Sequence, residues 1–495
     1  MLGWAYGASQ TGCRLPKMEI RITVVDVLVA GGGNAALCAA IEAAEAGASV
    51  VVVETASKDF RGGNTRHTRN MRLAHDSANG ILTGPYPVEE FWDDLIGVTG
   101  GQTDETLARL LLERSATVWD WVTDRGVAFS PPLEGSLGLG RTNAFFLGGG
   151  RAMLNALYRH ALGLGVEVLY DTEVVEIHVK AETGEFEAVS VISHHSPSSA
   201  PVVIKARSFV AASGGFQANT EWMEQAWGPP ARNFVVRGTP NNTGTVLKML
   251  ERAGAAVTGD PTQCHAVAID GRAPDADGGI VTRLDCVPFG IVVNADGKRF
   301  YDEGEDFWPK RYAIWGRLVA AQPGQVGYVV IDAKSINRFM PSVFPPVEAN
   351  SVAELAAKLD IDPAQVCATI DEFNQACRPG TFDPTVHDDC VAHNIVPPKS
   401  HWARPIDKPP FYGYPLRCGV TFTYLAVRID SESRIQMSDG TSSPNMFAAG
   451  EIMAGNILGQ GYLAGLGMTI GTVFGRIAGS VAARVALPPE SVGVR

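Results

Sequence analysis

The sequence predicts an α/β protein built on a parallel sheet, and three observations support this prediction. Residues 23–30 and 49–54 are two almost wholly apolar runs that are rich in valine. Buried parallel strands have this composition because helices cover both faces of their sheet. A glycine turn and a helix-like stretch separate the two runs, and strand-like character returns near residue 446. Both ends of the chain are therefore expected to build one domain.

The chain of 495 residues is long enough for two or three domains. We expect residues 23–231 and 402–495 to form a discontinuous Rossmann-like domain. Residues 232–401, where prolines, turns and short helices mix, are expected to form an α+β capping domain. Residues 1–22 are expected to be a disordered extension, and Met18 is a candidate for the true start.

Composition narrows the classes of function. The formal net charge of -12 argues against nucleic-acid binding, which needs a positive surface. None of the 8 cysteines forms a C-x-x-C pair, so the sequence favours neither a zinc ribbon nor an iron–sulfur site. No apolar run approaches the ~20 residues that span a bilayer. We therefore expect a cytoplasmic protein with reduced thiols.

The first motif predicts dinucleotide binding. Gly31 permits a tight turn after the first strand, and Gly33 lets the backbone approach a diphosphate. Asn34, Ala35 and Ala36 open the following helix, whose N-terminus favours negative charge. Glu54 ends the second strand about 20 residues on, where an acid accepts hydrogen bonds from a ribose. This motif by itself fits either FAD or NAD.

A second motif favours FAD. Gly63, Asn64 and Thr65 follow the acid after a short loop, where a flavin needs backbone and small polar groups. Near the other end of the chain, Glu451 is placed to bond the ribityl hydroxyls. A helix beginning near Gly467 would point its positive end at the flavin ring, where negative charge develops on reduction. An NAD enzyme needs neither element.

These pieces together resemble the fumarate reductase/succinate dehydrogenase flavoprotein superfamily, in the right order from about residue 24 to residue 486. Residues 61–72 (RGGNTRHTRNMR), 300–308 (FYDEGEDFW) and 451–467 (EIMAGNILGQGYLAGLG) are similar to FAD-dependent tricarballylate dehydrogenases. The resemblance implies noncovalent FAD, because members with covalent flavin have a histidine where this chain has Asn64. It implies this set of FAD-binding residues: Gly31, Gly33, Asn34, Ala35, Ala36, Glu54, Gly63, Asn64, Thr65, Val174, Gly214, Glu451 and Gly467.

The substrate site is expected to bind a polyanion. A cationic run follows Asn64 and consists of Arg66, His67, Arg69 and Arg72. Arginine forms paired hydrogen bonds with carboxylates, so Arg66 and Arg69 are the candidate substrate ligands. The resemblance implies that His265 binds substrate. The proton-transfer arginine of fumarate reductases has no aligned counterpart here, and Arg311 is the nearest. Tyr462 replaces their carboxylate-binding arginine, as in ketosteroid dehydrogenases. We rank Arg311 first, Tyr462 second and His265 third as proton acceptor.

The expected function is oxidation of tricarballylate, a small polycarboxylate, to cis-aconitate, with hydride passing to FAD. Electrons would then leave to a separate, membrane-associated iron–sulfur/haem protein, which would bring this cytoplasmic chain to the membrane. The alternatives are a fumarate reductase-like enzyme, a ketosteroid dehydrogenase-like enzyme, and a relative acting on a corrinoid-pathway tetrapyrrole. A flavin-binding electron-transfer subunit without a substrate site is an alternative of another class.

Overall fold

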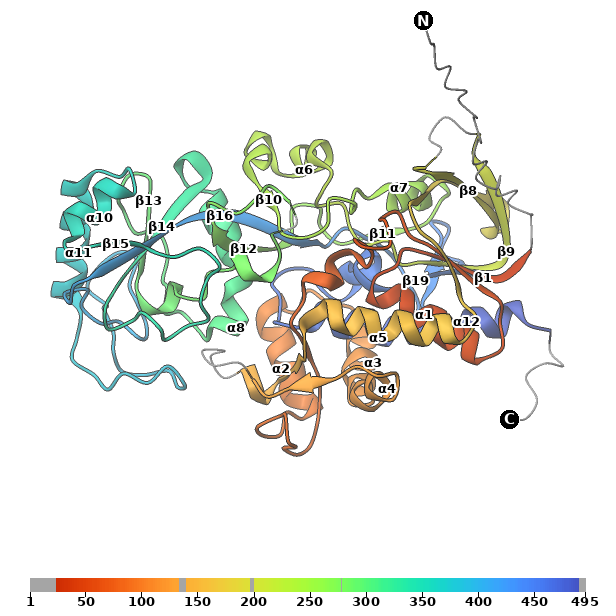
Figure 1. The fold of residues 1–495 in the computed structure, drawn as a ribbon, viewed down its shortest axis with the longest axis horizontal. Helices are drawn as coiled ribbons and strands as arrows, with labels where there is room; N and C mark the ends of the chain where they lie inside the picture. The colour runs from red at the N-terminus through yellow and green to blue at the C-terminus, as the bar shows by residue number, and fades with distance from the viewer. Residues whose placement is uncertain (1–23, 133–138, 196–199, 277, 489–495) are drawn as a thin grey trace, which may run out of the picture.

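The computed structural model describes residues 24–132, 139–195, 200–276 and 278–488. The expected extension at residues 1–22 lies outside the described residues. Two sheets lie at opposite ends of an elongated molecule, with a layer of helices below the larger one (Figure 1). This arrangement confirms the predicted α/β fold class.

The larger sheet carries the parallel core that the valine-rich runs predict. β1 pairs in parallel with β2 on one side and with β9 on the other, and β19 continues the parallel order beyond β9. The strands in spatial order are β18 (Arg434–Gln436), β19 (Ser442–Ala448), β9 (Val202–Ala211), β1 (Val25–Ala30), β2 (Val50–Val53) and β6 (Glu167–Leu169). β7 (Thr172–Lys180) and β8 (Glu185–Ser193) extend β9 as antiparallel strands. Chain segments from both ends therefore share one sheet.

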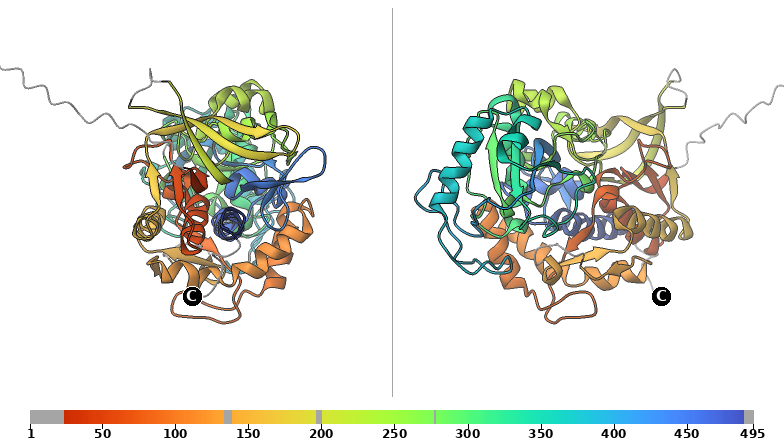
Figure 2. Two further views of the ribbon diagram at one scale, coloured as in Figure 1. Left: turned by 90° about the vertical axis from the view of Figure 1, so that its right-hand side faces the viewer. Right: turned by 60° about the vertical axis from the view of Figure 1, so that its left-hand side comes forward.

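Two helices that are far apart in sequence pack closely beside this sheet. These are α1 (Asn34–Glu45) and α12 (Leu466–Ala486), and they lie side by side in both views of Figure 2. Their contact is so close that a Cβ added at Gly479 would lie 2.2 Å from the carbonyl oxygen of Ala39. The remaining helices of this part are α2 (Val88–Thr99), α3 (Glu105–Ser115), α4 (Val118–Asp124), α5 (Gly149–Gly163), α6 (Thr220–Trp227) and α7 (Thr245–Arg252).

α12 corrects one expectation from the sequence. Within the described residues it is the one helix long and apolar enough to cross a membrane, although we found no apolar run of that length. Its glycines interrupt the pattern, so it did not read as a continuous apolar segment. Most of the helix is buried inside the protein, which is typical of a core helix.

The smaller sheet forms the cap. Its strands are β10 (Val235–Val236), β12 (Cys264–Asp270), β13 (Ile291–Asn294), β14 (Val326–Asp332), β15 (Val347–Ala349) and β16 (Phe411–Thr423). α10 (Val352–Lys358) and α11 (Pro363–Ala376) pack at its outer end, whereas α8 (Trp308–Arg311) and α9 (Trp315–Ala320) lie nearer the other domain (Figure 1).

β16 differs from the expected division of the chain. It pairs with β10, β12, β14 and β15, so the capping sheet takes its longest strand from the segment we expected in the Rossmann-like domain. β16 runs from the outer end of the cap back toward the larger sheet (Figure 1). Its apolar residues suit either sheet, and only the pairing partners decide which one it joins.

Candidate functional site

A cavity with a volume of about 370 Å³ lies where the parallel strands end. Of the predicted FAD-binding positions, all but Ala36 line it, including Val174 and Gly214. Ala36 is fully buried inside α1, one residue behind the lining. The cavity begins at the first glycine turn and Glu54, and it ends at Glu451 and the start of α12.

The nucleotide end of this cavity has backbone shaped for a diphosphate. Gly31 has a φ of 110°, and a Cβ there would lie 2.3 Å from the carbonyl oxygen of Ala212. α1 begins after Gly33 without a side-chain cap, which leaves its positive end facing the cavity. Glu54 is buried, and its Oε1 accepts a hydrogen bond of 2.8 Å from the Ala56 backbone. Burial raises the pKa of Glu54.

The opposite end is lined by small and polar groups. Nδ2 of Asn64 donates to the Thr421 carbonyl oxygen at 2.6 Å, and its Oδ1 accepts from the Thr239 backbone at 2.8 Å. Oε1 of Glu451 accepts from the Thr423 backbone at 2.9 Å, and burial raises the pKa of this carboxyl to about 7. α12 starts at the cavity wall, with Gly467 in the lining. The hydrogen-bonding groups and the glycines of the lining suit an extended dinucleotide with a flat ring at this end.

A second cavity of about 70 Å³ adjoins the first. Asn64, Thr68, Thr421 and Tyr462 line both cavities, so the two share a wall at the end of the first cavity that carries Glu451 and Gly467. Because the second cavity is far smaller, it suits a small molecule lying beside the ring.

Three arginines face the smaller cavity from different elements. Arg69 precedes β3 (Asn70–Arg72), Arg237 follows β10, and Arg283 follows a short 3-10 turn (Ile280–Thr282). All three are buried. Burial, reinforced by Arg283, lowers the pKa of Arg69 to about 9 and that of Arg237 to about 10, and both remain cationic at neutral pH. Nη2 of Arg69 has no hydrogen-bond partner within the described residues.

His265 and Tyr462 complete the wall. Their rings stack with centroids 3.9 Å apart, and Tyr312 meets His265 edge-on at 5.3 Å. Burial, together with Arg237 and Arg283, lowers the pKa of His265 well below its ordinary value, so the ring is neutral. Neither of its ring nitrogens has a hydrogen-bond partner among the described residues. A buried imidazole without internal partners is placed to bond to a ligand or a water molecule in the cavity.

The structure separates the predicted catalytic residues into two groups. Arg69, His265 and Tyr462 line the smaller cavity, whereas Arg66 and Arg311 line neither cavity. Arg66 lies over the Phe60 ring, with its guanidinium carbon 5.0 Å from the ring centroid. Arg311 forms an ion pair with Glu305 at 2.5 Å, and the side chains of both are 32% exposed. Arg66 belongs to the 3-10 turn Gly63–His67, whereas Arg69 lies beyond this turn, next to β3.

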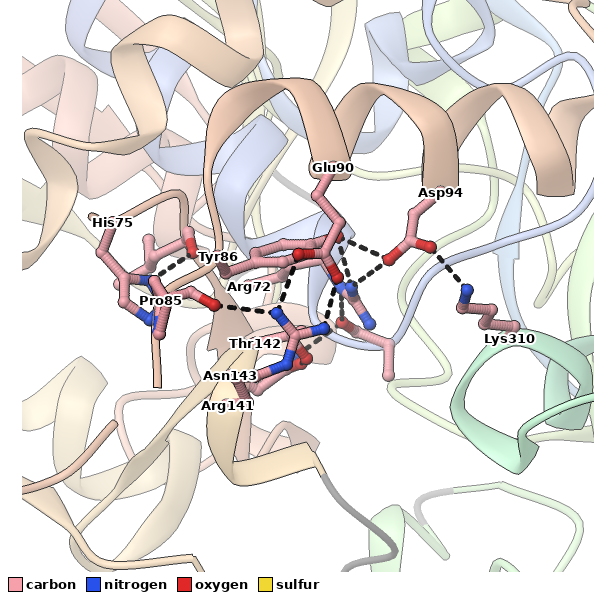
Figure 3. A network of polar contacts seen from close by, with 12 residues as sticks. Arg72, His75, Pro85, Tyr86, Glu90, Asp94, Arg141, Thr142, Asn143 and Lys310 are labelled. Atoms are coloured by element: carbon pink, nitrogen blue, oxygen red, sulfur yellow. Dashed lines mark hydrogen bonds and ion pairs between the residues drawn. The ribbon is translucent and has the colours of Figure 1, made fainter. Parts of the chain in front are cut away.

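Arg72, the last member of the cationic run, belongs to a structural network (Figure 3). Its Nη1 donates to the Tyr86 hydroxyl at 2.7 Å and lies 3.4 Å from Asp94 Oδ2. Asp94 of α2 also pairs with Lys310 of α8 at 2.6 Å, which joins the cap to the other domain. Arg141 and Glu90 form a neighbouring ion pair. The Arg72 side chain therefore bonds to other residues of the protein and is not placed to bind a substrate carboxylate.

Three residues of the smaller cavity were not predicted from the sequence: Arg237, Arg283 and Tyr312. Each lies in the cap segment, where isolated polar residues carry no motif of their own. Arg283 stands only two residues from Asp285, a spacing that is typical of a local ion pair. Only the return of the cap over the flavin end brings these side chains to Arg69 and His265.

The fold and the larger cavity define a flavoprotein. The chain belongs to the FAD binding domain family, whose profile matches residues 26–467. It is 26% identical over 469 residues to an NADH:fumarate oxidoreductase of Klebsiella pneumoniae, covering 93% of this chain and 48% of that protein. It is 25% identical over 478 residues to a fumarate reductase (cytochrome) of Shewanella frigidimarina, covering 93% and 77%. The chain thus spans about half the length of the first relative.

A solved structure shows the same fold. The open conformation of a flavocytochrome c3 fumarate reductase superposes with a TM-score of 0.74 and 24% identity, covering 94% of this chain and 79% of that one. The family profile and the two relatives support the expected superfamily, and the solved structure supports the fold.

Proposed function

We propose that the chain is an FAD-dependent oxidoreductase that acts at a carbon–carbon bond of a small polycarboxylate. The smaller cavity carries this proposal, because three buried guanidinium groups converge there with a neutral histidine, next to the flavin end of the larger cavity. Buried cations are costly unless anions pair with them. Carboxylates match the geometry of guanidinium donors.

Tricarballylate and cis-aconitate are the substrate pair that we propose. The support is the resemblance of three motifs, together with three arginines that could each meet one carboxylate. Bound FAD would supply the hydride acceptor. Arg69, Arg237 and Arg283 would hold the carboxylates, and His265 would donate or accept one neutral hydrogen bond. Tyr462 is placed to exchange the proton, since its ring lies in the wall shared by the two cavities.

A reductase acting on fumarate or a similar dicarboxylate is the second candidate. Two relatives bear names that specify fumarate, and their similarity extends over most of this chain. Asp285 balances only one of the three positive charges, and Arg237 bonds only to neutral oxygens. A neutral steroid would leave the remaining charge without an anion, so the cavity disfavours a ketosteroid substrate.

Anaerobic flavin spectroscopy on the purified holoprotein tests the proposal. Tricarballylate should bleach the oxidised flavin if the first pair is right. Fumarate should instead reoxidise chemically reduced flavin if the second candidate is right. The Arg237→Met variant should lose most of either response and keep its FAD. A response to neither compound, nor to cis-aconitate with reduced flavin, would contradict a polycarboxylate function.

We also propose that FAD is held noncovalently, because Asn64 has no nucleophilic atom for a flavin linkage and its amide bonds to two backbone groups. Acid precipitation should leave the flavin in the supernatant, and yellow protein in the pellet would refute this. Electrons would pass to a separate iron–sulfur/haem protein at the membrane, with the chain itself in the cytoplasm. A membrane fraction that reoxidises the reduced flavin would support this partner.

A further inference from the structure

Asp285 is a buried carboxylate directly behind the arginines of the smaller cavity. Its Oδ2 accepts a hydrogen bond of 2.7 Å from Nη2 of Arg283, and it lies 3.7 Å from Nη2 of Arg69. Its Oδ1 accepts a hydrogen bond of 2.7 Å from Nε1 of Trp308 in α8. Asp285 itself does not line the cavity. It therefore acts on a ligand only through the arginines that it holds.

The charge of this group is fixed by the same contacts. Burial by itself would raise the pKa of Asp285, but Arg283 and Arg69 together hold it below its ordinary value, so it is ionised. Arg237 donates its hydrogen bonds to neutral oxygens, at 3.1 Å to Gly279 and at 2.7 Å to Thr421. Because His265 is neutral, three arginines and one aspartate give the group a net charge of +2.

We propose that Asp285 is a positioning and specificity-determining residue for the substrate. It orients Arg283 and Arg69, and it reduces the charge that the cavity offers from three positive charges to two. One unit charge matters here, because interactions across a buried site are screened far less than in water. Asp285 thus reduces the preference for three substrate carboxylates over two that the three arginines would give by themselves. This inference rests on the proposed function and deepens it.

Removal of the carboxylate charge tests this directly. In the Asp285→Asn holoprotein, affinities for tricarballylate and for succinate are measured from the change that each causes in the flavin absorbance. The ratio of tricarballylate affinity to succinate affinity should rise by about tenfold relative to the unchanged protein. A purely structural role would weaken both ligands alike and leave the ratio unchanged, which would overturn the inference.

Two further variants separate charge from geometry. Trp308→Phe removes one hydrogen bond to Asp285 without changing any charge, so the ratio should stay constant even if both affinities fall. If this affinity ratio rose as much in Trp308→Phe as in Asp285→Asn, the charge argument would be overturned. Arg69→Gln lowers the positive charge, so the ratio should fall. If Asp285→Asn does not fold, Arg69→Gln becomes the test of the charge argument. An unchanged affinity ratio in Arg69→Gln would then refute the inference.

The polycarboxylate function and the role of Asp285 can be refuted separately. If the flavin of the unchanged protein responds to neither compound, the polycarboxylate function is wrong and this inference falls with it. If it responds to them and the variants leave the ratio unchanged, only the role of Asp285 is wrong.

Discussion

Glu451 is a buried carboxylate whose hydrogen bonds only partly offset the loss of water. Burial raises its pKa to about 7, above the ordinary value of 4.5 for a glutamate. Between these pH values the folded protein binds more protons at this residue than the unfolded chain does. Rising pH therefore lowers the free energy of unfolding through that window. Above about pH 7 the penalty of holding Glu451 ionised in the folded protein is constant.

We predict that Glu451→Gln removes this penalty in the apoprotein. The variant should gain stability relative to the unchanged protein as pH rises from 4.5 to 7, on the order of 3 kcal/mol in all. Urea unfolding at a series of pH values measures the difference, in which the contributions of all other acids cancel. Parallel pH curves for the two proteins would show that Glu451 titrates normally.

The proton-transfer residue is a second question at the residue scale. Tyr462 lines both cavities, whereas Arg311 lines neither and pairs with Glu305. We now predict that Tyr462→Phe slows flavin reduction by roughly a hundredfold with FAD still bound, as expected for loss of a general acid–base group. Arg311→Gln should change the rate little. Stopped-flow absorbance checks both, and the opposite pattern would restore the ranking made from the sequence.

At the scale of elements, the contact of α1 with α12 couples the two halves of the FAD site. α1 begins at the diphosphate end of the cavity, and α12 begins at the flavin end. Small residues let the two backbones approach each other. Each helix thus fixes the position of the other, and the cavity depends on both.

We predict that Gly479→Ala destabilises the protein by about 1–3 kcal/mol, because the new methyl group would meet the Ala39 backbone at 2.2 Å. FAD affinity should fall with it, since α1 must shift. Gly97→Ala in α2 is the matched control, since its Cβ would meet no atom within 4 Å. That control should be neutral or stabilising by up to about 1 kcal/mol. Thermal unfolding and FAD titration would measure both effects, and equal behaviour of the two variants would disprove close packing at Gly479.

At the scale of the whole molecule, one apolar core runs through both domains. It includes Val27 of the larger sheet and Val267 of the cap sheet, while a smaller cluster lies under α10 and α11. β16 strengthens the connection, since it ends at Thr423, which bonds to Glu451 beside the FAD cavity. A continuous core favours cooperative unfolding.

We predict that the holoprotein unfolds in a single calorimetric transition and that added FAD raises the midpoint temperature. The calorimetric and van't Hoff enthalpies should agree. Two resolved transitions, with only one of them shifted by FAD, would instead show that the cap folds independently.

The parts of the site that the sequence predicted are local. Gly31, Gly33 and Glu54 lie within one strand–helix–strand unit, where spacing along the chain fixes position in space. The same holds for Gly63 to Thr65. The sequence did not predict that Arg69 lines the smaller cavity while Arg66 does not. The reason is that the 3-10 turn Gly63–His67, which carries Arg66, has no clear signal in the sequence.

The sequence by itself determined the α/β class and the FAD-binding family, because backbone motifs and burial patterns are short-range and recur at fixed spacing. Only the tertiary structure decided which sheet β16 joins, and which cations meet beside the flavin end. Arg237, Arg283 and Asp285 converge on Arg69 from segments more than 150 residues away along the chain. The effect of each charge depends on the others, because burial removes the water that would otherwise screen their interactions.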